Sequence, residues 1–165
     1  MSENLPPSAL LDSSVVIAAF GGRPCEDKDL SLSFITDMLN ENRPVLIAAP
    51  TLAEINAGVP RTPLVRGIRV VAFDRQAAVV LAEKMPHELI KAIRDSEGGP
   101  LKYFKYDAQI VACGLRWGAS CLVTRDDPQR KRSERAGLKA HHPKDFAKKQ
   151  TEFAVGGRTI LKSVP

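Results

Sequence analysis

The stretch ALLDSSVVIAAF, residues 9–20, is the most informative segment of the chain. Its first residues are apolar and end at an acid, Asp12, a pattern typical of a short buried strand. Ser13 and Ser14 follow, and their hydroxyls are typical of a helix start before the apolar run over 15–20. The segment therefore predicts a strand that passes directly into a helix, with a carboxylate at the junction.

The same alternation of strands and helices continues along the chain. Further strands are predicted over 45–48, 68–73 and 120–124, and helices over 30–39, 52–57, 77–85 and 106–117. A short edge strand is expected over 137–140 and a brief helix near Phe146, whereas 95–105 is expected to be an ordinary loop rather than a mobile flap. This order favours an α/β fold with a parallel sheet and right-handed crossovers.

Composition and length are those of an ordinary globular domain. The 165 residues are 44% hydrophobic and 26% charged, which argues against a disordered or coiled-coil protein. We expect one domain over 1–149 and a tail over 150–165. No stretch approaches the roughly 18–20 apolar residues of a membrane span, and no export signal is evident, so a cytoplasmic protein is expected. Three cysteines without a paired spacing favour free thiols in a reducing compartment.

Four acids stand where a parallel sheet would bring them together. Asp12 follows the first strand, Asp126 follows the strand that ends at Thr124, and Asp107 is expected at a helix start. Glu54 lies early in the helix after the second strand. Ligands bind beyond the carboxyl ends of parallel strands, so these carboxylates are predicted to share one crevice. Each acid taken alone also fits a helix cap, a turn or an exposed helix position.

Clustered carboxylates need a compensating cation or protons, because like charges at about 4 Å repel by roughly 4 kcal/mol at an effective dielectric near 20. Oxygen ligands without His or Cys favour Mg²⁺ or Mn²⁺ over zinc. His87, His141 and His142 are not predicted to be ligands, and the pair before Pro143 is interpreted as a surface turn. The acids therefore indicate metal-dependent phosphodiester chemistry.

Four motifs, in order, resemble those of PIN domains. They are LLDSSVVI (residues 10–17), PTLAEI (50–55), YDAQIVA (106–112) and LVTRD (122–126). The match runs from about Ala9 to Phe146. It implies a three-layer α/β/α sandwich with a central parallel sheet and an Mg²⁺- or Mn²⁺-dependent endoribonuclease, most often the toxin of a VapC-type toxin–antitoxin pair.

The resemblance also implies roles for individual residues. Asp12 and Asp107 would hold the principal metal, Asp126 would complete its shell partly through water, and Glu54 would position a second ion or the attacking water. Ser14 and Thr124 would support these carboxylates through their hydroxyls. Water would attack the RNA phosphodiester in line and leave a 3′-hydroxyl and a 5′-phosphate. The family's usual aromatic does not follow Asp126, so Asp127 is a possible substitute for the fourth acid.

The basic charge is concentrated near the end of the chain. Residues 125–165 hold eleven Lys and Arg against five Asp and Glu, and the chain as a whole has a formal net charge of +5. Such a surplus attracts a phosphate backbone, although a basic run is also often a solvated surface. The residues expected to bind RNA are Arg125, Arg130, Lys131 and Arg132.

Other possibilities remain open at the sequence level. The chain is alternatively a catalytically silent PIN-like module that binds RNA or a protein. A toxin would need an antitoxin protein, which would inhibit by placing a basic side chain among the four acids in place of metal. A homodimer is also expected, with Phe34, Met38 and Leu39 either at an apolar dimer face or in the core.

Overall fold

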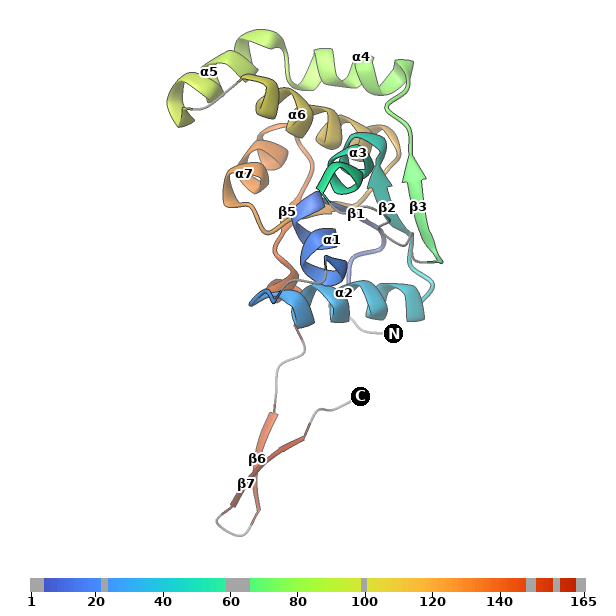
Figure 1. The fold of residues 1–165 in the computed structure, drawn as a ribbon, viewed down its shortest axis with the longest axis vertical. Helices are drawn as coiled ribbons and strands as arrows, with labels where there is room; N and C mark the ends of the chain where they lie inside the picture. The colour runs from blue at the N-terminus through green and yellow to red at the C-terminus, as the bar shows by residue number, and fades with distance from the viewer. Residues whose placement is uncertain are drawn as a thin grey trace.

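Five parallel strands form the sheet at the centre of the fold (Figure 1). The structure is a computed structural model that describes residues 5–21, 24–58, 66–98, 101–147, 151–155 and 158–162. The strands lie in the order β3-β2-β1-β4-β5. Their bounds are β1 (Ala9–Leu11), β2 (Val45–Ala48), β3 (Ile68–Val71), β4 (Cys121–Val123) and β5 (Ala140–His141). The chain winds away from β1 in both directions, so a topological switch point lies between β1 and β4.

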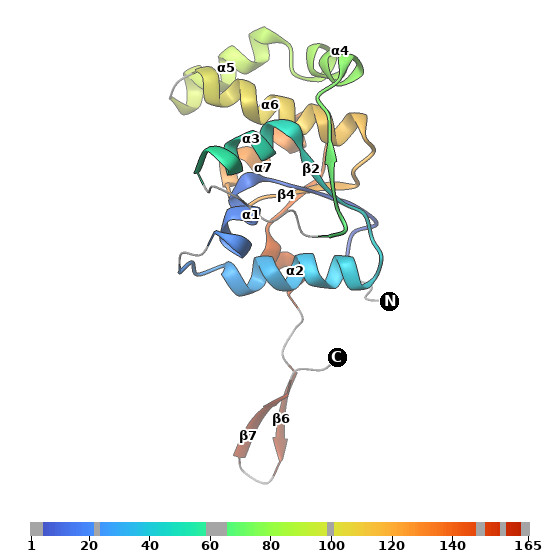
Figure 2. The same ribbon diagram turned by 45° about the vertical axis from the view of Figure 1, so that its right-hand side comes forward.

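Helices cover both faces of this sheet (Figures 1 and 2). α1 (Ser13–Phe20) and α2 (Lys28–Asn40) lie on one side, and α4 (Arg75–Lys84), α5 (His87–Glu97) and α6 (Leu101–Arg116) lie on the other. α3 (Ala49–Gly58), α7 (Asp127–Arg135) and the 3₁₀ helix η1 (Pro143–Phe146) complete the body of the fold. The three-layer α/β/α sandwich with a parallel sheet is therefore confirmed.

The sheet divides the core into two apolar clusters, because successive side chains of a strand point to opposite faces. Leu10 of β1 packs in the cluster that contains Ile110 and Val111 of α6. Its neighbour Leu11 packs in the cluster of α1 and α2, with Val15. All residues of β1, β2 and β4 are buried, as expected for central parallel strands with helices on both faces.

A glycine lets α6 lie close to the sheet. A Cβ atom at Gly114 would stand 2.6 Å from Cδ2 of Leu138 and 3.1 Å from Cδ2 of Leu10. Both leucines are buried, at 3% and 0% exposure, so neither has open space to move into. The absence of a side chain at position 114 thus sets the distance between α6, which carries Asp107, and the strand that precedes Asp12.

Two stretches that were expected to be irregular are helical. α5 ends at Glu97 and α6 begins at Leu101, so the predicted loop over 95–105 is mostly helix, with residues 99–100 outside the described ranges. Asp107 consequently lies about two turns inside α6 and not at a helix start. Residues 130–135, interpreted from their charge as a basic run, lie in α7, which spans Asp127–Arg135. The final edge strand lies at Ala140–His141, slightly later than the predicted 137–140.

A two-stranded antiparallel hairpin follows the sandwich. β6 (Thr151–Val155) pairs with β7 (Arg158–Lys162), and Figure 1 shows the hairpin apart from the five-stranded sheet. The sequence pattern did not predict these strands. The division into a domain over 1–149 and a tail over 150–165 remains a prediction.

A helix that spans a membrane needs roughly 20 predominantly apolar residues. Within the described ranges, none is both long enough and apolar enough to cross a bilayer.

Candidate acidic site

Asp12 lies at the switch point of the sheet. Its backbone N–H donates to the carbonyl of Val123 at 3.0 Å, which joins the ends of β1 and β4. Although Asp12 is the N-cap residue of α1, its side chain makes no capping hydrogen bond. Instead, Oδ2 accepts from Ser14 Oγ at 2.7 Å and from Thr124 Oγ1 at 2.9 Å. Asp12 is 6% exposed, and its carboxylate is held by two hydroxyls rather than acting as a helix cap.

The same two hydroxyls fix the segment after β4. Thr124 Oγ1 accepts from the backbone N–H of Asp126 at 3.0 Å, and Ser14 Oγ accepts from that of Arg125 at 3.1 Å. Asp126 then stands at the N-cap of α7, again without a capping hydrogen bond from its side chain. Ser14 and Thr124 thus tie Asp12 to the backbone that carries Asp126.

Asp107 on α6 and Glu54 on α3 complete the acidic group. The structure brings all four predicted acids to one pocket of about 390 Å³. We call this pocket the acidic site. Its lining residues are Asp12, Ser13, Ser14, Glu54, Gly98, Phe104, Asp107, Asp126, Gln129 and Arg132.

The carboxyl group of Asp107 is the one most affected by this environment. Burial raises its pKa from 3.8 to about 7, the nearby Arg132 opposes the rise, and the charges of the other three acids add to it. The acids therefore interact electrostatically within one site. A site that holds an ionised Asp107 at neutral pH needs positive charge close by.

Arg132 supplies such a charge in this structure. Its guanidinium donates to Oδ2 of Asp107, and only 9% of its side chain is exposed. The sequence had predicted that Arg132 is exposed in a basic run that binds RNA, whereas the structure buries it against Asp107. Lys131 is exposed, and Arg130 pairs with Asp127 at 2.9 Å. Arg125 pairs with Asp27 at 2.8 Å.

Asp127 lies outside the acidic site. Its side chain is 69% exposed and pairs with Arg130, and it does not line the pocket. Asp126, the acid of the fourth motif, lines the pocket instead.

The histidines also lie outside the acidic site. His142 is 8% exposed, and its Nδ1 accepts from the backbone N–H of Lys144 at 3.1 Å, which caps η1. The prediction that His142 lies in a surface turn was therefore wrong, because the side chain is used to start a short helix.

Phe34 and Met38 are buried in the core at 3% and 0% exposure, so the core alternative holds for both.

The donor atoms of the acidic site suit a hard divalent cation. They are carboxylate and hydroxyl oxygens, the ligands that Mg²⁺ and Mn²⁺ prefer. Gln129 adds a buried amide: its Nε2 donates to the backbone carbonyl of Asp107 at 3.3 Å, while Oε1 has no hydrogen-bond partner among the described residues. Within those ranges, no three His, Cys, Asp or Glu side chains are grouped closely enough to hold a metal as they stand. The chemistry fits a cation, and binding would require the side chains to converge.

Sequence reasoning missed the contribution of α7 to this site. Gln129 and Arg132 lie three residues apart and Ser133 follows, so all three fall on one face of the helix, which is buried. The helix contains no apolar repeat over 127–135, and a helical face was therefore not apparent. The spacing of the three polar residues was the available signal.

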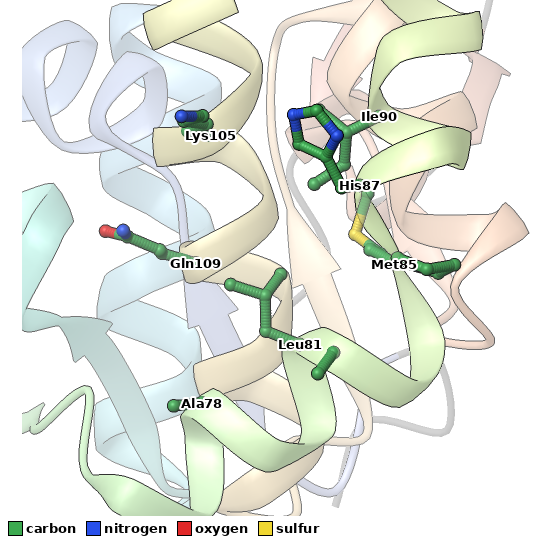
Figure 3. A pocket seen from close by; sticks show the side chains of 9 residues that line it. Ala78, Leu81, Met85, His87, Ile90, Lys105 and Gln109 are labelled. Atoms are coloured by element: carbon green, nitrogen blue, oxygen red, sulfur yellow. The ribbon is translucent and has the colours of Figure 1, made fainter.

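A second pocket lies on the far side of α6 (Figure 3). It measures about 370 Å³ and is mainly apolar, with Leu81, Met85 and Ile90 among its lining residues. His87 and Lys105 also line it, but no carboxylate does. This pocket therefore offers none of the acidic chemistry described above.

Comparison with solved structures supports the fold. No protein-family model matches the sequence, and no curated protein matches it either. Among solved structures, the chain is similar to one in the crystal structure of VapBC2 from Rickettsia felis bound to a DNA fragment from their promoter. The likeness covers 82% of this chain and 98% of that chain, with a TM-score of 0.56 and 16% sequence identity. The two chains share a fold. That fold agrees with the PIN-like sandwich predicted from the four motifs.

Proposed function

We propose that the protein is a divalent-metal-dependent endoribonuclease. The observation that carries this proposal is that Asp12, Glu54, Asp107 and Asp126 line one pocket at the switch point of a parallel sheet. The four residues lie on or next to four different helices, and each belongs to one of the four PIN-like motifs of the sequence. A group of hard oxygen donors at this edge suits a cation that works on phosphate.

Each residue of the acidic site would have its own role in metal binding and catalysis. Asp12 and Asp107 would hold the cation, Asp126 would complete its shell partly through water, and Glu54 would orient the attacking water or hold a second ion. When bound, Mg²⁺ or Mn²⁺ would supply Lewis-acid charge that activates water and neutralises charge on the scissile phosphate. Ser14 and Thr124 keep Asp12 oriented. In-line attack would leave a 3′-hydroxyl and a 5′-phosphate.

We further propose that the nuclease is the toxin of a toxin–antitoxin pair and that it forms a homodimer. The solved relative in fold belongs to a complex named VapBC2, which supports a partner protein for this chain as well. The partner would inhibit by placing a basic side chain among the four acids. A complex of this kind should bind Mn²⁺ more weakly than the isolated chain does, and unchanged Mn²⁺ affinity would mean that inhibition works in another way.

The test is cleavage of a mixed pool of structured RNAs by the purified chain in Mn²⁺, Mg²⁺ or EDTA. Asp107→Asn removes one predicted ligand, and Glu134→Gln changes an exposed acid on α7 that does not line the pocket. We expect metal-dependent cuts with 5′-phosphate ends, lost in Asp107→Asn and retained in Glu134→Gln. Equal cleavage by all three proteins would point to a contaminating nuclease.

A silent RNA- or protein-binding module is the second candidate. The ion pair between Arg132 and Asp107 favours it, because an internal cation already neutralises one of the acids. This candidate predicts RNA binding without cleavage in every metal, and equal RNA affinity for the wild type and Asp107→Asn.

A further inference from the structure

Arg132 is a buried cation inside a pocket lined by carboxylates. It donates to Oδ2 of Asp107, and its guanidinium carbon lies 4.4 Å from the centre of the Phe104 ring. An arginine held by a carboxylate and by an aromatic face has a defined orientation. Both contacts are made by α6, so the side chain of Arg132 bridges α7 to the helix that carries Asp107.

The rest of α7 keeps Arg132 in this position. Gln129, one turn earlier, donates to the backbone carbonyl of Asp107 at 3.3 Å. Ser133 donates to the backbone carbonyl of Leu138 at 2.9 Å and is fully buried. These two contacts, from residues on the same helix face as Arg132, hold α7 in the position that directs Arg132 to Asp107. By contrast, Arg130 on the same helix pairs with Asp127 outside the pocket.

A divalent cation and the guanidinium of Arg132 would both be stabilised by the negative charge of Asp107. A carboxylate has lone pairs for several partners, but the positive charge of Arg132 remains beside any cation that approaches Asp107. Two cations a few ångströms apart in a partly buried site repel each other strongly, and salt screens such a pair poorly. Metal binding would therefore be easier if the guanidinium moved away from Oδ2.

We propose that Arg132 is the internal counter-cation of the acidic site and that a divalent cation binds in competition with it. Arg132 then determines how much Mg²⁺ or Mn²⁺ is needed to load the site, and it stabilises the four acids while no metal is bound. This inference rests on the proposed function, since it assumes that the acids bind a divalent cation.

Mn²⁺ binding to the full chain tests the inference without relying on activity. Free Mn²⁺ is counted by electron paramagnetic resonance during titration of wild type, Arg132→Gln, Arg132→Lys and Arg135→Gln. Arg135 is the matched control, an exposed arginine on α7 that does not line the pocket. We expect Arg132→Gln to bind Mn²⁺ about tenfold more tightly or better, from the size of charge repulsion at this range. Arg132→Lys keeps the charge and should stay within about threefold of wild type, and Arg135→Gln should equal it.

A second measurement uses the wild-type chain, in case Arg132→Gln does not fold. The Nε–H signal of Arg132 is followed by nuclear magnetic resonance during addition of Mg²⁺, with the signal assigned by its loss in Arg132→Lys. Displacement from Asp107 should shift it, whereas an unchanged signal while the backbone amides of Asp12 and Asp107 shift would overturn the inference.

The possible failures are distinguishable. If wild type binds Mn²⁺ and a folded Arg132→Gln binds it no more tightly, Arg132 has only a structural role and the proposed function stands. If neither protein binds Mn²⁺ and neither cleaves RNA in any metal, the proposed function and the inference are both wrong.

Discussion

Thr124 shows how a single hydroxyl connects two acids of the site. It donates to Asp12 at 2.9 Å and accepts from the backbone N–H of Asp126 at 3.0 Å, while its side chain is almost fully buried. Thr124→Val keeps the shape and removes both hydrogen bonds. We expect unfolding free energy to fall by about 1–3 kcal/mol, and Mn²⁺ affinity to fall as well. Urea denaturation in EDTA and Mn²⁺ titration measure the two effects.

Thr124→Ser is the control for this prediction. It keeps the hydroxyl and loses one methyl group, which costs about 1 kcal/mol in a buried position. Mn²⁺ affinity should therefore stay close to that of wild type. A Thr124→Val protein with wild-type stability and wild-type Mn²⁺ affinity would show that the hydroxyl is dispensable.

The three cysteines differ in burial, and we expect them to differ in reactivity. Burial raises the pKa of Cys121 to about 12, and burial together with the charge of Asp74 raises that of Cys113 to about 11. Both thiols stay protonated at pH 8, and the thiolate is the reactive form. Cys25 is only partly buried. Iodoacetamide at pH 8 should therefore add one group to the native chain, at Cys25, and three to the urea-unfolded chain, as measured by mass spectrometry.

The same thiols predict how stability depends on pH. The folded chain keeps protons on Cys113 and Cys121 that the unfolded chain releases near pH 9, so the folded state binds more protons above that pH. Their contribution to stability is lost as pH rises from about 9 to about 12. Modification of all three cysteines in the native chain at pH 8 would contradict this assignment.

At the scale of elements, α6 depends on close approach to the sheet. Alanine in place of glycine inside an exposed helix usually stabilises a protein by up to about 1 kcal/mol. At Gly114 the added Cβ would lie 2.6 Å from Cδ2 of Leu138. We therefore expect Gly114→Ala to lower unfolding free energy by about 1–3 kcal/mol, as overpacking does.

A double-mutant cycle separates this steric effect from helix propensity. Leu138→Ala removes the nearest atom, so Gly114→Ala should cost less in that background than in the wild type. Urea denaturation of the four proteins gives the coupling. Equal costs in the two backgrounds would show that Leu138 does not limit the approach of α6.

The elements also explain which parts of the site were predictable. The junction of β1 and α1 has an apolar strand, an acid and two hydroxyls in sequence, and its structure follows from that local pattern. Asp107 lines the acidic site, but its place in the helix was not predicted, because α6 begins six residues before it, at Leu101. α7 was missed because its buried face is polar, and hydrophobic periodicity does not detect such a face.

For the whole molecule, the order of strands was less predictable than their existence. Alternation of strands and helices indicates a parallel sheet, but it does not state which strand lies in the centre. The convergence of Asp12 and Asp126 depends on β1 lying next to β4, which are separated by more than a hundred residues. Neither the local patterns nor the four motifs stated that β1 lies beside β4, although the rule that ligands bind beyond the carboxyl ends of parallel strands predicted a shared crevice. The hairpin β6–β7 lay beyond the region that the motifs covered.

The predicted domain boundary can be tested by truncation. The two apolar clusters are formed by residues between Leu5 and Phe146, so the chain 1–149 contains both of them. We expect 1–149 to unfold within about 0.5 kcal/mol of the full chain, as for changes away from a core. A chain that ends at residue 137 lacks the core residues Leu138 and Ala140 and should fail to fold. A large loss of stability in 1–149 would place the hairpin within the folding unit.

The affinity of the whole molecule for RNA should depend on its exposed basic side chains and not on its total number of basic residues. Lys131 is exposed on α7, whereas Arg132 is buried against Asp107. The affinity for single-stranded RNA should decrease with salt, because each phosphate contact releases counterions. Lys131→Gln should therefore reduce the slope of log affinity against log salt by about 0.7.

Arg132→Gln provides the contrast to Lys131→Gln, and Lys84→Gln provides the control. Lys84 is exposed on α4, which lies on the opposite side of the sheet from α1 and α2 (Figure 2). Its replacement should leave the slope unchanged. Arg132→Gln should also leave the slope unchanged, since the guanidinium is held by Asp107 and we expect it to make no phosphate contact. Fluorescence anisotropy with a labelled oligonucleotide in EDTA over a range of salt measures all three. A reduced slope for Arg132→Gln alone would return Arg132 to the RNA-binding surface that the sequence predicted, and would mean that its pairing with Asp107 is given up when RNA binds.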